Sequence, residues 1–213
     1  YSLLNHYNFY SNAFKMNYKL ILKIKNRDAH IAIIGLGYVG LPLAMRFSEE
    51  GLKTIGFDID EEKINLLNDG KSYIKHIPVE KITAGINAGF TATTNFKEIS
   101  NVDAIIICVP TPLGAHNEPD LSYIKRTLEA IKPYLKKNQL LILESTTYPG
   151  TTEEEIVPFI QSISESSPVM RHAPRFSIGE NFFIGYSPER EDPGNKKYTT
   201  KTIPKVVSGY TEN

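Results

Sequence analysis

The sequence lacks the features that mark several classes of protein. Its 213 residues include one cysteine, Cys108, and no tryptophan. One cysteine excludes an internal disulfide framework and a zinc site built from several cysteines, and we predict no metal site. The longest uninterrupted apolar run, 104–109, is far shorter than the ~20 residues of a membrane-spanning helix. With no signal-peptide pattern at the start, we expect a cytoplasmic protein without a membrane partner.

An excess of one charge is also missing. The 24 basic and 24 acidic residues give a formal net charge of zero. No basic field is therefore available to attract nucleic acid. The hydrophobic fraction of 41% and the charged fraction of 23% are those of an ordinary globular protein with a core. We expect a globular domain that does not bind nucleic acid.

Neither end of the sequence reads as a natural terminus. The chain begins with Tyr1, whereas Met16 followed by Asn17 would make a natural start. Residues 1–16 are rich in Asn, Tyr and Ser without a clean period, and we expect them to be disordered or extraneous. The chain stops at Asn213 directly after a strand-like segment. We therefore expect one domain over residues 17–213, taken from a longer protein.

Strand-like and helix-like segments alternate along the chain. Runs typical of strands are 30–34, 54–57, 104–109, 140–143, 182–186 and 206–207. Runs typical of helices are 17–27, 41–50, 61–67, 78–88, 121–137 and 151–161. This alternation predicts an α/β fold, a doubly wound, mostly parallel Rossmann sheet with helices on both faces. We interpret the less regular stretch 162–179 as a loop insertion.

A glycine-rich turn with the sequence GLGYVG follows the first buried strand and opens a helix. This context is the one that a dinucleotide-binding motif requires. Gly35 allows the tight turn, Gly37 lets the backbone approach a pyrophosphate, and Gly40 lets helix and strand pack closely. The backbone N–H groups of Tyr38 and Val39, with the helix dipole, would hold the phosphate charge. The alternative is a plain strand–helix turn.

Asp58 ends the second strand, where an acidic side chain can accept both ribose hydroxyls of adenosine. A carboxylate would repel a 2′-phosphate there, so the sequence favours NAD over NADP. The alternative for Asp58 is a helix N-cap, a role that Asp60 could share. Lys63, one turn further on, could touch the same ribose or be a solvated lysine.

The buried run 104–109 ends in Val109, Pro110 and Thr111, at the edge where open α/β sheets bind ligands. The prolines on either side of Thr111 fix a rigid corner, and its hydroxyl is offered toward the cofactor; a purely rigid loop is the alternative. Cys108 lies in an apolar run with no His or Lys beside it in sequence. We interpret it as a buried, inert thiol and not as a nucleophile.

Two later segments bring polar groups to the same edge of the sheet. Residues 144–150, with the sequence ESTTYPG, supply a cluster of hydroxyl groups after a strand. Glu189 and Arg190 place a carboxylate and a guanidinium side by side after the next strand. Such a pair is useful near a phosphorylated or carboxylate-forming substrate. Taken singly, each segment is also consistent with capping or with exposed surface.

Together these segments resemble the N-terminal NAD-binding domain of the UDP-glucose/GDP-mannose dehydrogenase family. The resemblance runs from about residue 17 to 210 and rests on six ordered motifs, at 35–44, 56–60, 109–113, 144–152, 187–190 and 204–209. Within the family, the sequences of segments 144–152 and 188–194 most resemble those of UDP-N-acetylglucosamine 6-dehydrogenases.

The resemblance implies oxidation of the C6 alcohol of a UDP-sugar to the uronic acid with two NAD. Family roles map onto Thr146, which would help to position a water and the nicotinamide, and onto Glu189, which would assist proton transfer in thioester hydrolysis. Arg190 departs from the commoner apolar residue, and we assign it to the substrate. Products of such enzymes usually feed polysaccharide biosynthesis.

The resemblance also implies that part of the enzyme is missing from this sequence. In the family, the nucleophilic cysteine and the lysine and asparagine that handle the alkoxide come from a middle helix and a C-terminal substrate domain. The middle helix is also the usual core of a homodimer. We therefore expect this chain alone to bind NAD without turning over a nucleotide sugar. The alternatives are a non-catalytic NAD-binding module, a GDP-mannose or UDP-glucose 6-dehydrogenase, or another NAD-dependent dehydrogenase with a similar half-fold.

Overall fold

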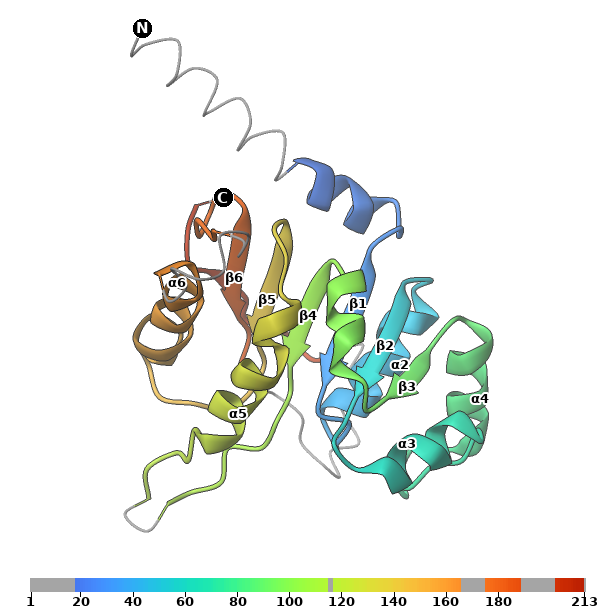
Figure 1. The fold of residues 1–213 in the computed structure, drawn as a ribbon. Helices are drawn as coiled ribbons and strands as arrows, with labels where there is room; N and C mark the ends of the chain where they lie inside the picture. Colours follow the sequence, from blue (N-terminus) through green and yellow to red (C-terminus); the bar gives the residue numbers. More distant parts are fainter. Residues whose placement is uncertain (1–17, 115–116, 166–174, 189–201, 213) are drawn as a thin grey trace, which may run out of the picture.

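The computed structural model describes residues 18–114, 117–165, 175–188 and 202–212. In this part of the chain, seven strands form one sheet in the order β3-β2-β1-β4-β5-β6-β7 (Figure 1). The strands β1 to β6 pair in parallel, and β7 pairs with β6 in antiparallel orientation. The predicted disorder of residues 1–16 and the predicted site residues Glu189 and Arg190 lie outside the described residues.

The strands are short and are built from buried aliphatic residues. Their bounds are β1 His30–Ile34, β2 Lys53–Phe57, β3 Thr91–Thr93, β4 Ala104–Ile107, β5 Gln139–Leu143, β6 Phe182–Tyr186 and β7 Ser208–Gly209. All four residues of β4 are buried, as expected for a central parallel strand covered on both faces. The strand order reverses between β1 and β4, which is where open α/β sheets place a ligand.

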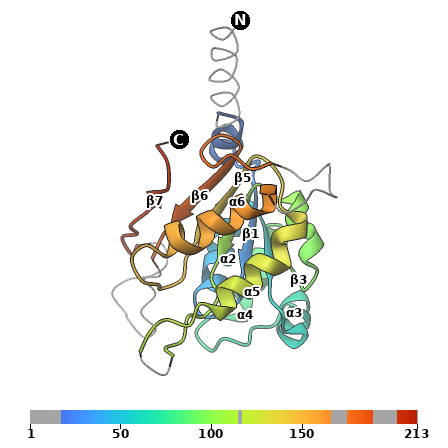
Figure 2. The same ribbon diagram turned by 60° about the vertical axis from the view of Figure 1, so that its left-hand side comes forward.

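Helices cover both faces of this sheet. On one face lie α2 Gly40–Glu49, α3 Glu61–Asn68 and α4 Val79–Asn87, and on the other α5 Ser122–Ile131 and α6 Val157–Glu165. Figure 2 shows α5 and α6 in front of the strands and α2 behind them. Two hydrophobic cores result, one on each side. The predicted doubly wound, mostly parallel Rossmann fold is confirmed. No helix in the described ranges is both long and apolar enough to cross a bilayer.

Three predicted elements need correction. The helix expected over 121–137 stops at Ile131 and continues only as a short 3₁₀ turn, Lys132–Tyr134, because Pro133 has no N–H to donate and its ring crowds the preceding turn. The strand expected at 206–207 is wrong, since pairing begins at Ser208 and both valines are exposed. The first part of the expected 162–179 loop is helical, because α6 runs to Glu165.

Two elements were not predicted. β3 is three residues long and polar, so it lacks the apolar run by which the other strands were found. A 3₁₀ helix over Phe96–Asn101 follows it, capped by the Asn95 side chain, which accepts from Lys97 N–H.

Two predicted helices are present with different details. The helix expected over 17–27 is present over 18–25. The expected 151–161 helix begins as a π-helical turn, Thr152–Ile156, which leads into α6.

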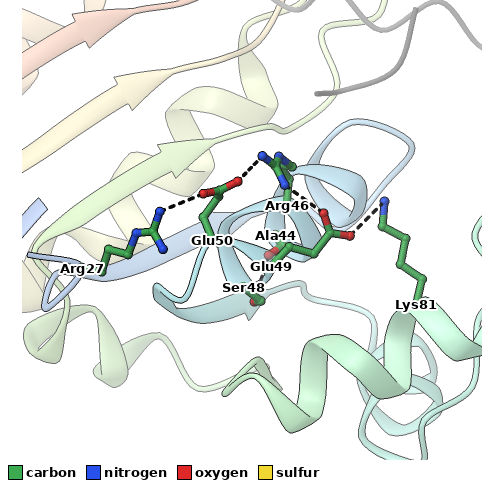
Figure 3. Close-up of polar contacts among 7 residues, drawn as sticks. All are labelled: Arg27, Ala44, Arg46, Ser48, Glu49, Glu50 and Lys81. Carbon is green, nitrogen blue, oxygen red and sulfur yellow. Dashed lines mark hydrogen bonds and ion pairs between the residues drawn. The ribbon is translucent and has the colours of Figure 1, made fainter. Parts of the chain in front are cut away.

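Charged residues on the outer side of α2 form a chain of ion pairs (Figure 3). Arg46 contacts Glu49 of its own helix at 3.1 Å and also Glu50, which directly follows that helix. Glu50 pairs with Arg27, which precedes β1, at 3.1 Å. Glu49 pairs with Lys81 of α4 at 3.6 Å. The chain therefore links α2 to two neighbouring segments on the surface of the domain.

Candidate functional site

A cavity of about 660 Å³ lies at the carboxyl ends of β1, β2, β4 and β5. The structure brings ten of the predicted site residues together in its lining: Gly35, Gly37, Tyr38, Val39, Asp58, Lys63, Val109, Pro110, Thr111 and Thr146. Gly40 is buried directly behind the turn and does not line the cavity. The predicted cofactor residues thus share one site, at the switch point of the sheet.

The three glycines of the turn occupy three different environments. Gly35 has a φ of 93°, and a Cβ there would lie 2.8 Å from the carbonyl oxygen of Cys108. A Cβ on Gly40 would lie 1.8 Å from the carbonyl oxygen of Gly35, so a larger residue cannot fit without moving α2. A Cβ on Gly37 would meet nothing within 4 Å. Gly37 therefore borders open space in the cavity, where a ligand could approach the backbone.

The N-terminus of α2 faces this turn. Its first hydrogen bond runs from Leu41 N–H to the carbonyl of Gly37, at 3.1 Å. The N–H groups of Tyr38 and Val39 come before it, and no side chain caps the helix at Val39. Amides in this position, at the positive end of the helix dipole, favour an anion. The Tyr38 ring is exposed and stacks on His76, with ring centroids 5.6 Å apart.

Asp58 ties the glycine-rich turn to the end of β2. Its Oδ2 accepts from Leu36 N–H at 2.9 Å, and its Oδ1 accepts from Asp60 N–H at 3.1 Å. The cap of α3 is Asp60, whose carboxylate accepts from Glu62 and Lys63 N–H, so the capping role considered for Asp58 belongs to its neighbour. Lys63 Nζ lies 3.7 Å from Asp58 Oδ2. Each Asp58 oxygen keeps a second lone pair for a ligand hydroxyl.

Tyr73 is a support of the turn that the sequence did not reveal. Its hydroxyl donates to the carbonyl of Leu36 at 2.5 Å. Burial, together with the nearby carboxylates of Asp58 and Asp60, raises the pKa of Tyr73 well above its ordinary value. The phenol therefore stays a neutral donor. Tyr73 lies between α3 and α4, in a stretch without periodicity, and this is why no pattern singled it out.

The opposite end of the cavity is formed by the residues after β4 and β5. The Ser145 hydroxyl donates to the carbonyl of Val109 at 2.7 Å, and the Thr111 hydroxyl donates to the carbonyl of Thr146 at 2.5 Å. These two bonds join the two loops. The Thr111 hydroxyl, predicted to be offered to a cofactor, thus has a protein partner, although its oxygen can still accept a hydrogen bond. Thr146 is exposed at the cavity wall.

Glu144 is a buried carboxylate in the same wall. It directly follows β5, and its side chain, 5% exposed, pairs with the ammonium group of Lys205. Burial lowers the pKa of the Lys205 ammonium below its ordinary value. Cys108, which directly follows β4 as Glu144 follows β5, is buried as predicted. Sequence reasoning assigned no role to Lys205, which lies 61 residues from its partner.

One side of α5 also lines the cavity and was not singled out from the sequence. Tyr123, Arg126, Thr127 and Ala130 line the cavity, and Phe96 adjoins them. Their spacing of three and four residues is that of one helix face, so the pattern could have been found once the helix was assigned. Among the described residues, no three His, Cys, Asp or Glu side chains gather as a metal site would require.

Comparison with known proteins identifies the family of this site. Residues 29–213 match the model of the UDP-glucose/GDP-mannose dehydrogenase family, NAD binding domain. The chain belongs to this family. The predicted family and the predicted cofactor, NAD, are confirmed by the match, and the cavity lies within the matched region.

Named relatives of this nucleotide-sugar dehydrogenase domain are longer proteins. Protein CapL of Staphylococcus aureus is 40% identical over 184 residues, which cover 86% of this chain and 40% of CapL. UDP-N-acetyl-D-glucosamine 6-dehydrogenase of Pseudomonas aeruginosa is 38% identical over 87% of this chain and 41% of that enzyme. The structure of the UDP-N-acetyl-mannosamine dehydrogenase Cap5O from S. aureus superposes with a TM-score of 0.73, at 29% identity, over 86% of this chain and 42% of Cap5O. The chain thus spans less than half the length of these relatives.

Proposed function

We propose that this domain binds NAD in the cavity at the switch point. The pyrophosphate would lie against the Tyr38 and Val39 amides, and the adenosine ribose would donate its hydroxyls to Asp58. The nicotinamide would then extend toward the loops after β4 and β5, past Val109, Pro110 and Thr111. The observation that carries this orientation is the attachment of the Asp58 carboxylate to Leu36 N–H, which fixes the acidic group beside the glycine-rich turn. NAD is favoured over NADP because a 2′-phosphate would meet that carboxylate.

We further propose that the whole protein oxidises the C6 alcohol of a UDP-sugar to the acid with two NAD, as a cytoplasmic homodimer. The favoured substrate is UDP-N-acetylglucosamine, after the P. aeruginosa relative named above. UDP-N-acetylmannosamine is the second candidate, because the matched S. aureus structure is named for it. Bound NAD accepts a hydride in each of the two oxidations. Thr146 would position a water and the nicotinamide, Glu189 would move protons in thioester hydrolysis, and Arg190 would contact the substrate.

Catalysis by this chain alone is not expected, because the one thiol at the described site is almost completely buried. Cys108 is the one cysteine of the sequence; it adjoins the cavity but is only 8% exposed, and its Cβ lies 3.2 Å from where a Gly40 Cβ would be. A thioester route needs a cysteine that the C6 aldehyde can reach. The purified 213-residue chain should therefore produce no NADH from UDP-N-acetylglucosamine and NAD. Steady NADH formation, followed by absorbance, would show that this part of the proposal is wrong.

The cofactor site is tested by Asp58→Asn. Asparagine keeps an oxygen that can accept from Leu36 N–H, but it removes the charge and one of the strong acceptors for the ribose. Titration calorimetry should show NAD bound roughly tenfold more weakly, since a hydrogen bond to a charged group contributes about 1.5–3 kcal/mol. The same variant should discriminate less against NADP.

Asp69→Asn is the matched control. Asp69 is an exposed aspartate paired with Lys71 at the end of α3, and it does not line the cavity. NAD affinity should be unchanged in this variant. If the parent chain and Asp58→Asn bind NAD with equal affinity, the ribose does not bind to Asp58. The proposed orientation of the cofactor would then be wrong.

A further inference from the structure

The cavity has a carboxylate at each end, and the two are held differently. Asp58 has backbone N–H groups as its close partners, with Lys63 Nζ 3.7 Å away. Glu144 has a direct ion pair with Lys205. In the orientation proposed above, Asp58 adjoins the adenosine ribose, whereas Glu144 adjoins the nicotinamide. A charge at the second position therefore faces the part of the cofactor that changes charge during the reaction.

Glu144 is fixed in place by the sheet. Ile107 of β4 is in register with Leu143 of β5, and Glu144 N–H donates to the carbonyl of Ile107 at 2.8 Å. Glu144 and Cys108 are consequently neighbours at the carboxyl edge, beside Gly35, whose Cβ position would touch the Cys108 carbonyl. The backbone of Glu144 cannot move away from the cavity without breaking the β4–β5 pairing.

Lys205 reaches this position from the segment that precedes β7. Ser208 and Gly209 pair with β6, and the Tyr210 N–H donates to the carbonyl of Ile184 at 3.0 Å, which fixes the end of the segment. The Lys205 side chain is 25% exposed and that of Glu144 is 5% exposed. Charges in such surroundings are screened much less than charges on the surface. Burial disfavours the ammonium and lowers the pKa of Lys205.

The oxidised and reduced cofactors differ by one positive charge, on the nicotinamide ring. We propose that the Lys205–Glu144 ion pair sets the relative affinity of this domain for NAD⁺ and NADH, by neutralising a carboxylate that would otherwise favour the oxidised ring. This assignment rests on the proposed function, because it requires the nicotinamide at the Glu144 end of the cavity. Both residues act here on the electrostatics of cofactor binding and not as catalytic residues.

The sign of the effect differs between the two partners. Without the ammonium, the Glu144 carboxylate is unpaired and attracts the cationic ring of NAD⁺. Without the carboxylate, the ammonium is unpaired and disfavours that ring, so NADH is preferred. Removing both charges returns the site close to its original balance. A residue that only supports the fold would change the two affinities in the same direction.

The experiment measures the dissociation constants of NAD⁺ and NADH separately, by titration calorimetry at pH 8, on the full chain. Lys205→Met should raise the ratio of the NADH constant to the NAD⁺ constant roughly tenfold, as expected for one partly screened charge nearby. Glu144→Gln should lower the same ratio roughly tenfold. The double variant, Lys205→Met with Glu144→Gln, should have nearly the same ratio as the parent chain. Lys81→Met, which removes a partly exposed lysine that pairs with Glu49 and does not line the cavity, is the matched control and should leave the ratio unchanged.

The outcomes separate this inference from the proposed function. Opposite shifts in the two single variants support the charge-balancing role. If both cofactor forms still bind and the ratio of their dissociation constants is unchanged in both single variants, the charge-balancing role is wrong. The proposed cofactor site would not be affected by that result. Failure of the parent chain to bind either form would overturn both. Because the two single variants have opposite expected signs, misfolding of one, seen by circular dichroism, leaves the other as a decisive test.

Discussion

Two charged regions of this domain use the same residue types in opposite surroundings. The Lys205–Glu144 pair lies at the cavity wall, and Glu144 is almost completely buried. The chain of ion pairs around Arg46 lies on the outer side of α2, where Glu49 and Glu50 are about 40% exposed (Figure 3). The partners in the first region are 61 residues apart, whereas Arg46 finds its helical partners three and four residues away.

The difference between the two regions shows how burial determines the contribution of an ion pair to stability. Water screens and solvates an exposed carboxylate whether or not a lysine is near, so its ion pair contributes little. A buried carboxylate has lost that solvation and depends on its partner. The free energy of unfolding should therefore respond most to loss of Lys205, less to loss of Asp103, whose lysine partner is half exposed, and least to loss of Arg46.

The largest effect is expected for Lys205→Met, which leaves Glu144 buried and unpaired. Urea unfolding should show a loss of about 2 kcal/mol, less than for a fully buried pair because Lys205 is partly exposed. Glu144→Gln combined with Lys205→Met should recover most of this loss, since neither charge then remains. A double variant no more stable than Lys205→Met would mean that the lysine acts through packing and not through its charge.

The two regions also show what the sequence could predict. The GLGYVG turn and the apolar runs of β1, β2, β4, β5 and β6 are local patterns, and the sequence alone locates each of them. The Arg46 contacts with Glu49 and Glu50 follow from helical spacing and could have been found in the same way. Such features depend on a few neighbouring residues, so the chain specifies them locally.

Contacts between segments that are distant in the sequence could not be predicted from local patterns. Lys205 meets Glu144, and Tyr73 meets the carbonyl of Leu36, only because the sheet brings their segments together. The strand predicted at 206–207 failed for a related reason. Valine has a high β propensity, but a strand needs a partner, and the pairing with β6 starts only at Ser208. Local preference fixed the type of segment there and not its register.

An intermediate effect is expected at Asp103, on the opposite edge of the sheet. Its carboxylate accepts from Lys23 Nζ at 2.7 Å and from His30 N–H at 3.0 Å, and its side chain is 12% exposed against 51% for Lys23. Burial alone would raise the pKa of Asp103. The two hydrogen bonds and the Lys23 charge outweigh burial and hold that pKa below its ordinary value. The folded state therefore favours the ionised carboxylate.

The pH dependence follows from this direction. Asp103 contributes its stability above the unfolded pKa of aspartate, about 3.9, and loses it as the pH falls through the lower folded value. Asp103→Asn should cost about 1 kcal/mol at pH 7 and flatten the acid side of the stability curve below about pH 4. Parallel curves for the parent and the variant would show that Asp103 titrates alike in the folded and unfolded chains.

The smallest effect is expected for Arg46→Met, although Arg46 has two ion-pair partners in Figure 3. Methionine keeps an apolar stem of similar length, so the variant tests the charge. Exposed pairs of this kind contribute about 0.3–0.5 kcal/mol each, and they do not add fully because both partners are on one arginine. Thermal unfolding should show a small loss that shrinks further in 0.5 M NaCl, where the screening length is only about 4 Å. A loss of more than about 1.5 kcal/mol in the free energy of unfolding, unaffected by salt, would mean that this exposed network contributes as much as the buried pair. Solvent exposure would then not explain the difference between the two regions.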